Sequence, residues 1–103
     1  MYKLVYLPHA LEDLVEIATY IAKKLNNPIA AENITSQLVE KAESLKEFPY
    51  VYPVHNPIRK LNKEYRKLRV KNWIMFYYVN EGEKTITIAR AIYGKCNFEN
   101  ILE

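Results

Sequence analysis

Seven basic side chains are clustered in residues 59–71, and they are the first candidates for chemistry in this chain. A single acid, Glu64, opposes Arg59, Lys60, Lys63, Arg66, Lys67, Arg69 and Lys71. The flanking regions, residues 1–58 and 72–103, carry net charges of −2 and −1. Cations held together on one strand would attract a polyanion or an acidic partner. The alternative is a solvated sheet edge that lysines protect from further pairing.

Cationic and phenolic groups near this stretch could support metal-free cleavage of RNA through its 2′-hydroxyl. This reaction needs a base, an acid and cations that stabilise the charge on the phosphorane. The candidate catalytic residues are Arg69, Lys71, Tyr93 and Lys95. The candidates for binding nucleic acid or another target are Arg59, Lys60, Arg66, Lys67, Arg69 and Lys71. Many nucleic-acid-binding surfaces have the same mixture, so it permits catalysis without being diagnostic of it.

Other kinds of catalytic site find little support in the composition. His9, His55 and Cys96 lie far apart without the spacing of metal ligands, so we expect no bound metal. With Gly82 and Gly94 as the only glycines, a glycine-rich phosphate loop cannot form. We therefore expect no cofactor.

Residues 65–94 predict a three-stranded antiparallel meander that would hold the basic residues. Basic and apolar residues alternate over positions 66–71, as in a strand with one wet and one dry face. The continuous apolar run 73–79 should be covered on both faces of the sheet. Residues 85–93 are β-branched and alternating, which indicates a third strand.

Two turn signals separate these strands. Lys71-Asn72 suits a tight hairpin, because Asn tolerates a left-handed backbone. Residues 80–84 suit a longer turn, in which Gly82 is free to take positive φ.

A strand and a helical hairpin are predicted before the meander. Tyr2 to Leu7 alternates as a strand, and His9 to Leu25 has the period of a helix. Its apolar face should hold Leu11, Leu14, Val15, Ala18, Ile21, Ala22 and Leu25. Asn27-Pro28 should start a second helix that runs to about Glu47. Its buried stripe should hold Ala31, Ile34, Leu38, Ala42, Leu45 and Phe48. The short connection makes the helices an antiparallel hairpin that can cover one side of the sheet.

Arg90 is predicted to make a structural ion pair. It shares strand parity with the isoleucines of residues 86–92, which points it toward the apolar side of the sheet. A buried guanidinium requires a partner. We expect Asp13 or Glu16 on the first helix to supply it.

Prolines at positions 49, 53 and 57 end regular structure through about Asn62. Tyr50 and Tyr52 in this loop are expected to anchor it onto the core, and stacking on nucleic-acid bases is the alternative. After the meander, Asn97 can cap a short helix from Phe98 to Leu102.

The overall composition predicts one domain spanning residues 1–103. A single cysteine excludes an intramolecular disulfide and favours the reducing cytoplasm. The apolar runs are too short for a signal peptide or a membrane span.

The order of these elements and several short motifs resemble the RelE/ParE toxins of bacterial toxin–antitoxin systems. The first helix carries Ala10-x-x-Asp13-Leu14-x-x-Ile17-x-x-Tyr20-Ile21, and Asn27-Pro28-x-Ala30-Ala31 opens the second. Phe48-Pro49, Tyr65-Arg66-Lys67-Leu68 and Phe76-Tyr77-x-Val79 follow. The most specific piece is Ile88-x-Arg90-x-Ile92-Tyr93-Gly94, and Ile101-Leu102 closes the match. The resemblance implies an α+β fold of order β-α-α-β-β-β, with a helical hairpin on one face of a small antiparallel sheet.

The resemblance also implies a growth-inhibiting toxin that a cognate antitoxin neutralises, with a higher-order complex of the two as a possible assembly. ParE-like members act on DNA gyrase, and RelE-like members are endoribonucleases that cut messenger RNA on the ribosome. RelE-like toxins usually have an arginine where Ile74 follows Trp73, and a tyrosine near the place of Leu102. These departures favour the ParE branch, with the messenger RNA nuclease as the alternative. A remnant that only binds antitoxin or nucleic acid is a second alternative.

Overall fold

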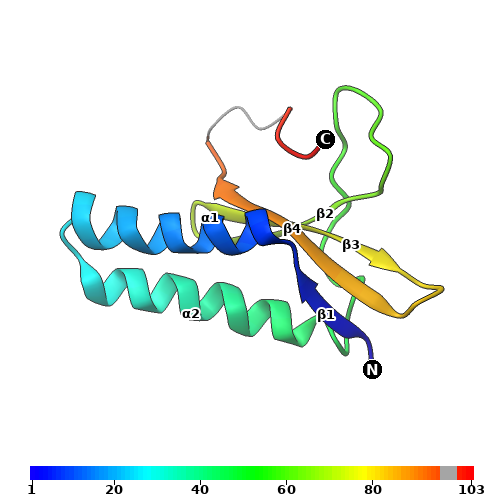
Figure 1. Cartoon of the computed structure of the whole chain (residues 1–103), viewed down its shortest axis with the longest axis horizontal. Coiled ribbons are helices and arrows are strands. Elements are labelled where there is room, and N and C mark those ends of the chain that lie inside the picture. Colours follow the sequence, from blue (N-terminus) through cyan, green and yellow to red (C-terminus); the bar gives the residue numbers. More distant parts are fainter. Residues whose placement is uncertain (96–99) are drawn as a thin grey trace.

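Two helices pack against one face of a four-stranded sheet in the computed structural model, which describes residues 1–95 and 100–103 (Figure 1). In chain order the elements are β1 (Lys3–Tyr6), α1 (Pro8–Thr19), a π-helical turn (Tyr20–Lys24), α2 (Pro28–Ser44), β2 (Arg66–Val70), β3 (Trp73–Asn80) and β4 (Thr85–Tyr93). The predicted α+β order β-α-α-β-β-β is therefore confirmed.

The strand order in the sheet is β1-β4-β3-β2. β2, β3 and β4 form the predicted antiparallel meander. β1 pairs with β4 in parallel, so the sheet is mixed and the prediction of a wholly antiparallel sheet is corrected at this strand. Because β1 leads into the helical hairpin rather than into a tight β-turn, no turn forces it to run against its neighbour.

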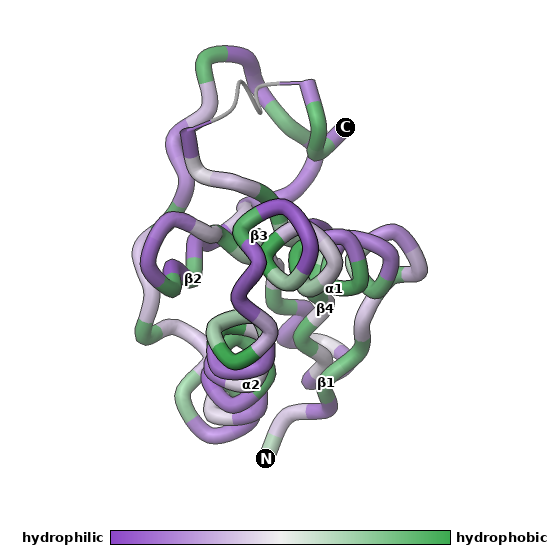
Figure 2. Tube along the Cα trace, turned by 90° about the vertical axis from the view of Figure 1, so that its left-hand side faces the viewer, coloured by the Kyte–Doolittle hydropathy of each residue, from purple (hydrophilic) through white to green (hydrophobic). Residues whose placement is uncertain are grey.

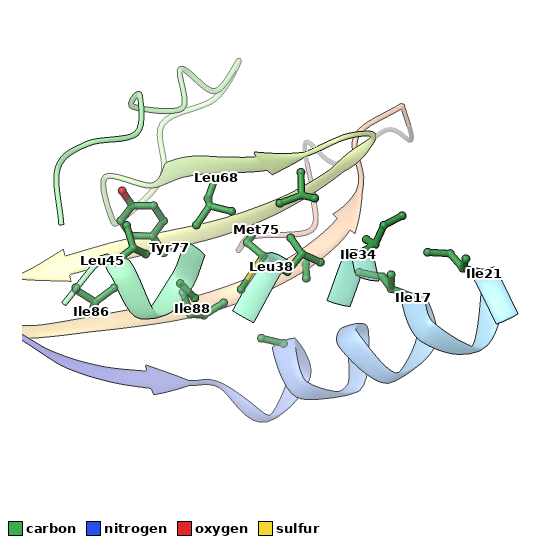
Figure 3. Packing of buried hydrophobic residues seen from close by; sticks show 14 of the residues in the cluster. Ile17, Ile21, Ile34, Leu38, Leu45, Leu68, Met75, Tyr77, Ile86 and Ile88 are labelled. Carbon is green, nitrogen blue, oxygen red and sulfur yellow. The ribbon is translucent and has the colours of Figure 1, made fainter. Parts of the chain in front are cut away.

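β3 is covered on both faces of the sheet, as predicted. On the helix side, Met75 and Tyr77 lie in the larger hydrophobic cluster with residues of both helices (Figure 3). On the opposite side, which we call the outer face, Ile74 and Phe76 form a second cluster. The other members of that cluster are Tyr65, Ala89 and Ile92, with Leu61, Tyr78, Ile101 and Leu102 packed against it. The outer face is thus covered by the loop before β2 and by residues 100–103.

Viewed along their axes, the helices lie side by side next to the sheet (Figure 2). α2 begins as predicted, because the side chain of Asn27 accepts a hydrogen bond from the amide of Ala30 at 3.1 Å and Pro28 occupies the first turn. It ends at Ser44 rather than about Glu47. Phe48 lies beyond this end and is 61% exposed, so its predicted burial is wrong.

The buried face of α1 differs from the predicted one. Ala10, Asp13 and Ile17 are buried, whereas Leu11 and Val15 are exposed. The apolar stripe of α1 is wider than its contact with β4 and α2, so residues at its border face solvent. Apolar periodicity gives the width of such a stripe, and the neighbouring elements decide which part of it is buried.

The left-handed backbone positions are also not those predicted. In the β2–β3 turn Lys71 has φ 53°, and in the β3–β4 turn Lys84 has φ 51°, while neither glycine has positive φ. Longer hairpin loops commonly contain a turn followed by one left-handed residue, and Lys84 takes that last position. The side chain of Asn80 supports this turn by accepting the Glu83 amide at 3.0 Å.

Part of the predicted final helix, with its cap Asn97, lies outside the described residues. Asn100 and Ile101 form a turn. Within residues 1–95 and 100–103, no helix is long and apolar enough to cross a membrane. Over the same residues, no three His, Cys, Asp or Glu side chains are close enough to hold a metal ion.

Candidate functional site

The four candidate catalytic residues lie at one end of the sheet. Lys71 is in the β2–β3 turn, and Arg69 is two residues before it. Tyr93 and Lys95 flank Gly94, whose amide donates to the carbonyl oxygen of Asn72 at 2.7 Å. This hydrogen bond fixes the end of β4 against the turn. The four residues nevertheless do not share one face of the sheet.

Lys71 and Tyr93 border a cleft on the helix side. The cleft has a volume of about 740 Å³ and lies between the helices and the ends of β3 and β4. Tyr20, Trp73 and Tyr93 form a row of aromatic rings along it, with centroid distances of 6.2 Å and 5.3 Å between successive rings. Tyr20 and Tyr93 are 48% and 39% exposed, so these rings are accessible from solvent.

Asp13 and Arg90 also line this cleft, and they form the ion pair that the sequence suggests. Arg90 Nε donates to Asp13 Oδ2 at 2.7 Å, and the terminal guanidinium nitrogen donates to Oδ1 at 3.0 Å. The backbone amide of Ala91 donates to Oδ2 at 3.0 Å. Asp13 is 5% exposed. The carboxylate therefore binds both a cation and a backbone donor of β4, beyond the last residue that pairs with β1.

A β-bulge corrects the strand-parity reasoning for Arg90. The register of β3 and β4 shifts so that Phe76 pairs with Arg90 and Tyr77 with Ile88, which leaves Ala89 as the additional residue. Ile88 then lies in the helix-side cluster and Ile92 in the outer-face cluster. A bulge redirects the side chains that follow it, which no alternation of residue types reveals.

Arg69 lies on the outer face with Lys67. The two alternate with Leu68 and Val70, which belong to the helix-side cluster. A β-carbon built on Gly94 would lie only 3.0 Å from a guanidinium nitrogen of Arg69. The lack of a side chain at Gly94 therefore lets the guanidinium pack directly against the end of β4.

The remaining candidate binding residues are dispersed. Arg66 shares the helix side of β2, donates to the carbonyl of Tyr52 at 2.8 Å and lies 4.9 Å from the ring centroid of Tyr50. Tyr50 and Tyr52 thus tie the proline-rich loop to β2, in agreement with the anchoring interpretation. Arg59 and Lys60 are exposed in the following part of the loop. Arg66 therefore holds the loop against β2, and Lys67 and Arg69 form the basic surface of the strand.

Glu81 is the centre of a polar cluster that sequence reasoning missed. Its carboxylate accepts from the hydroxyl of Tyr2 at 2.5 Å and from the hydroxyl of Tyr50, and it pairs with Lys84 at 2.8 Å. Hydrogen bonds from Lys84, Tyr2 and Tyr50 lower the pKa of Glu81 to about 2. The same interaction raises the pKa of Tyr50 to about 12. Lys84 is only three residues from Glu81, but Tyr2 and Tyr50 are remote from it in sequence, so no local pattern could have revealed their contacts.

The fold of this chain is similar to the folds of solved toxin–antitoxin proteins. The ParDE toxin–antitoxin system of P. aeruginosa superposes with a TM-score of 0.69 at 20% identity, covering 90% of this chain and 96% of the other. The RelBE2 toxin–antitoxin complex of Mycobacterium tuberculosis gives 0.64 at 18% identity, covering 89% and 96%. The isolated RelE toxin of E. coli gives 0.64 at 14% identity, covering 94% and 88%. At these identities the likeness establishes the fold alone.

Sequence comparison identifies the family. None of the curated proteins matches this chain significantly in sequence. The family model for the "ParE toxin of type II toxin-antitoxin system, parDE" matches residues 4–95 of the 103. Because this match covers most of the chain, the protein belongs to the ParE toxins of type II toxin–antitoxin systems, within the RelE/ParE superfamily.

Proposed function

We propose that this protein arrests growth by a ParE-like action on DNA gyrase, as the toxin of a plasmid-stabilisation or addiction module. The match of residues 4–95 to the ParE family carries this proposal. We further propose that residues 1–103 form one domain that acts in the cytoplasm. The target distinguishes this activity from that of RelE-like members, which cleave messenger RNA.

The positions of the cationic residues support inhibition by binding rather than by cleavage. A nuclease of this kind needs its acid, base and cations to converge on one phosphate. Lys71 and Tyr93 border the helix-side cleft, whereas Arg69 packs against Gly94 on the outer face. Lys71 and Tyr93 are thus on the helix side and Arg69 is on the outer face, an arrangement that favours binding over convergence on one substrate atom.

A cognate antitoxin is the proposed protein partner, and toxin and antitoxin could assemble into a higher-order oligomer. An antitoxin segment with acidic and apolar residues would complement the basic surface made by Lys67 and Arg69. The double substitution K67Q/R69Q should therefore weaken antitoxin binding. K23Q/K24Q removes the same charge from exposed residues of the π-helical turn and serves as the matched control. Equal binding by the two variants would place the antitoxin elsewhere.

The target is tested by expressing the toxin without antitoxin and by assaying DNA supercoiling with purified gyrase. Growth arrest with double-strand DNA breaks, intact messages and inhibited supercoiling is the expected result. New messenger RNA 5′ ends inside translated codons, absent when translation is blocked, would contradict the gyrase proposal.

That second outcome would identify the alternative, a metal-independent, ribosome-dependent messenger RNA endonuclease. Its support is the contact of Arg69 with the segment that carries Tyr93 and Lys95. In that case R69Q and K71Q should abolish cleavage and growth arrest together. Harmless expression with neither effect would instead identify a remnant that only binds antitoxin or nucleic acid.

A further inference from the structure

Residue Glu103 fills a site made by donors of the loop before β2. Its carboxylate accepts the amide of Asn62 at 2.7 Å, the amide of Lys63 at 3.3 Å and the hydroxyl of Tyr65 at 3.2 Å. Arg59 donates to the backbone oxygen of Glu103 at 2.5 Å. Figures 1 and 2 both show residues 100–103 beside this loop.

These donors have the chemistry of an anion site. Two successive backbone amides that point to one acceptor form a concave positive surface, which binds carboxylates and phosphates alike. The amide of Asn62, followed by the other donors and by the charge of Arg59, lowers the pKa of Glu103. Burial, reinforced by Glu103, raises the pKa of Tyr65 to about 12, so its hydroxyl keeps its proton and remains a donor. The site is therefore built to hold a negative charge.

The surroundings of the site favour a nucleic-acid phosphate as its exchangeable ligand. Arg59, Lys60 and Lys63 belong to the same loop and are exposed. Lys67 and Arg69 lie on the outer face, the face that Tyr65, Ile101 and Leu102 also cover. The ammonium group of Lys63 lies 4.8 Å from the ring centroid of Tyr78, and this contact keeps another cation on the outer face. A phosphodiester offers two oxygens to such donors, as the carboxylate of Glu103 does.

We propose that the amides of Asn62 and Lys63, with Tyr65 and Arg59, form a subsite for one backbone phosphate of a nucleic acid, and that Glu103 is its built-in competitor. The inference goes beyond the proposed function, because it does not depend on whether the target is gyrase-bound DNA or messenger RNA. It assigns residues 100–103 two effects: they cover the outer-face cluster, and they hold the phosphate site closed.

The test measures binding of a short single-stranded DNA oligonucleotide by fluorescence anisotropy at several salt concentrations. E103Q removes the competing charge and should bind roughly three- to tenfold more tightly than wild type. One additional phosphate contact should steepen the dependence of log K on log salt by about 0.7. E40Q is the matched control, because Glu40 is an exposed acid of α2 and its substitution changes the net charge equally. It should change neither quantity by comparable amounts.

Second-site variants keep the result specific to this site. In the E103Q background, Y65F and R59Q should each reverse part of the gain, with circular dichroism showing that the fold is retained. Equal effects of E103Q and E40Q would overturn the proposal, as would weaker DNA binding by E103Q. So would an E103Q protein that binds an acidic peptide at this site but no oligonucleotide. Gyrase inhibition and growth arrest are scored separately, so failure of the subsite is distinguishable from failure of the proposed function.

Discussion

Asp13 offers the sharpest test of how this fold is stabilised. Its buried carboxylate accepts three hydrogen bonds, two from Arg90 and one from the amide of Ala91. The side chain of Arg90 is 17% exposed, so water can replace only part of the hydrogen bonding that Arg90 would lose if Asp13 were removed. The substitution D13A should therefore remove two hydrogen bonds of the guanidinium and one of the Ala91 amide.

The expected loss of stability follows from these contacts. Removing one partner of a buried ion pair costs about 3–5 kcal/mol, because the remaining charge stays buried. D13N keeps the shape of the side chain but removes its negative charge. It also places an amide NH₂, itself a donor, next to the donors of Arg90 and Ala91. We expect D13A to lower the free energy of unfolding by about 3–5 kcal/mol and D13N by about 2–4 kcal/mol. For a domain of this size, each kcal/mol of lost stability lowers the melting temperature by about 4–8 °C. Both losses are therefore easily measured.

Urea denaturation followed by circular dichroism provides the assay, with E16Q as the control. Glu16 lies on the same helix and borders the same cleft but is exposed, so E16Q should change stability by less than about 0.5 kcal/mol. The double variant D13L/R90M should recover much of the loss, because a matched apolar pair leaves no unpaired charge. A D13N protein as stable as E16Q would refute the reasoning, since Arg90 and Ala91 would then not depend on this carboxylate.

Three further outcomes follow from the structure. G94A places a β-carbon 3.0 Å from Arg69 and Ile74 and should cost about 1–3 kcal/mol in denaturation, whereas G82A, with its nearest atom at 3.4 Å, should be close to neutral. Y77F removes a buried hydrogen bond of 2.8 Å to a loop carbonyl and should lower the free energy of unfolding by about 1 kcal/mol; an unchanged urea midpoint would contradict this. The pKa of Glu81 is lowered from 4.5 to about 2 in the folded state, so its contribution to stability is present above pH 4.5 and is lost as the pH falls through about 2. The difference in unfolding free energy between wild type and E81Q should therefore shrink over that range, and a difference that grows on acidification would contradict the assignment.

Local patterns were sufficient for the secondary structure and much of the core. Asn27-Pro28 marks the start of α2, and the continuous apolar run of β3 predicts a strand that is covered on both faces. The pairing of Arg90 was reached from the principle that a buried charge needs a partner. These conclusions hold because each depends on residues adjacent in sequence or on a rule that applies wherever a charge is buried.

The surfaces were less predictable. The basic residues of one sequence stretch have three different structural roles. Arg66 supports the loop, and Arg59 contacts Glu103. Lys67 and Arg69 form the basic surface of the outer face. The alternation of a strand separates neighbouring side chains onto opposite faces, so charge density along the chain does not equal charge density in space.

The sequence by itself determined the order of the elements, the helix start at Asn27, the apolar identity of β3 and the family resemblance. These features depend on short-range periodicity, capping and turn chemistry, which residue types specify directly. Only the tertiary structure decided that β1 runs parallel to β4, that a bulge at Ala89 interrupts the side-chain alternation of β4, and that Glu103 closes the loop site. Each of these joins groups dozens of residues apart, and their meeting depends on how whole elements pack rather than on any local pattern.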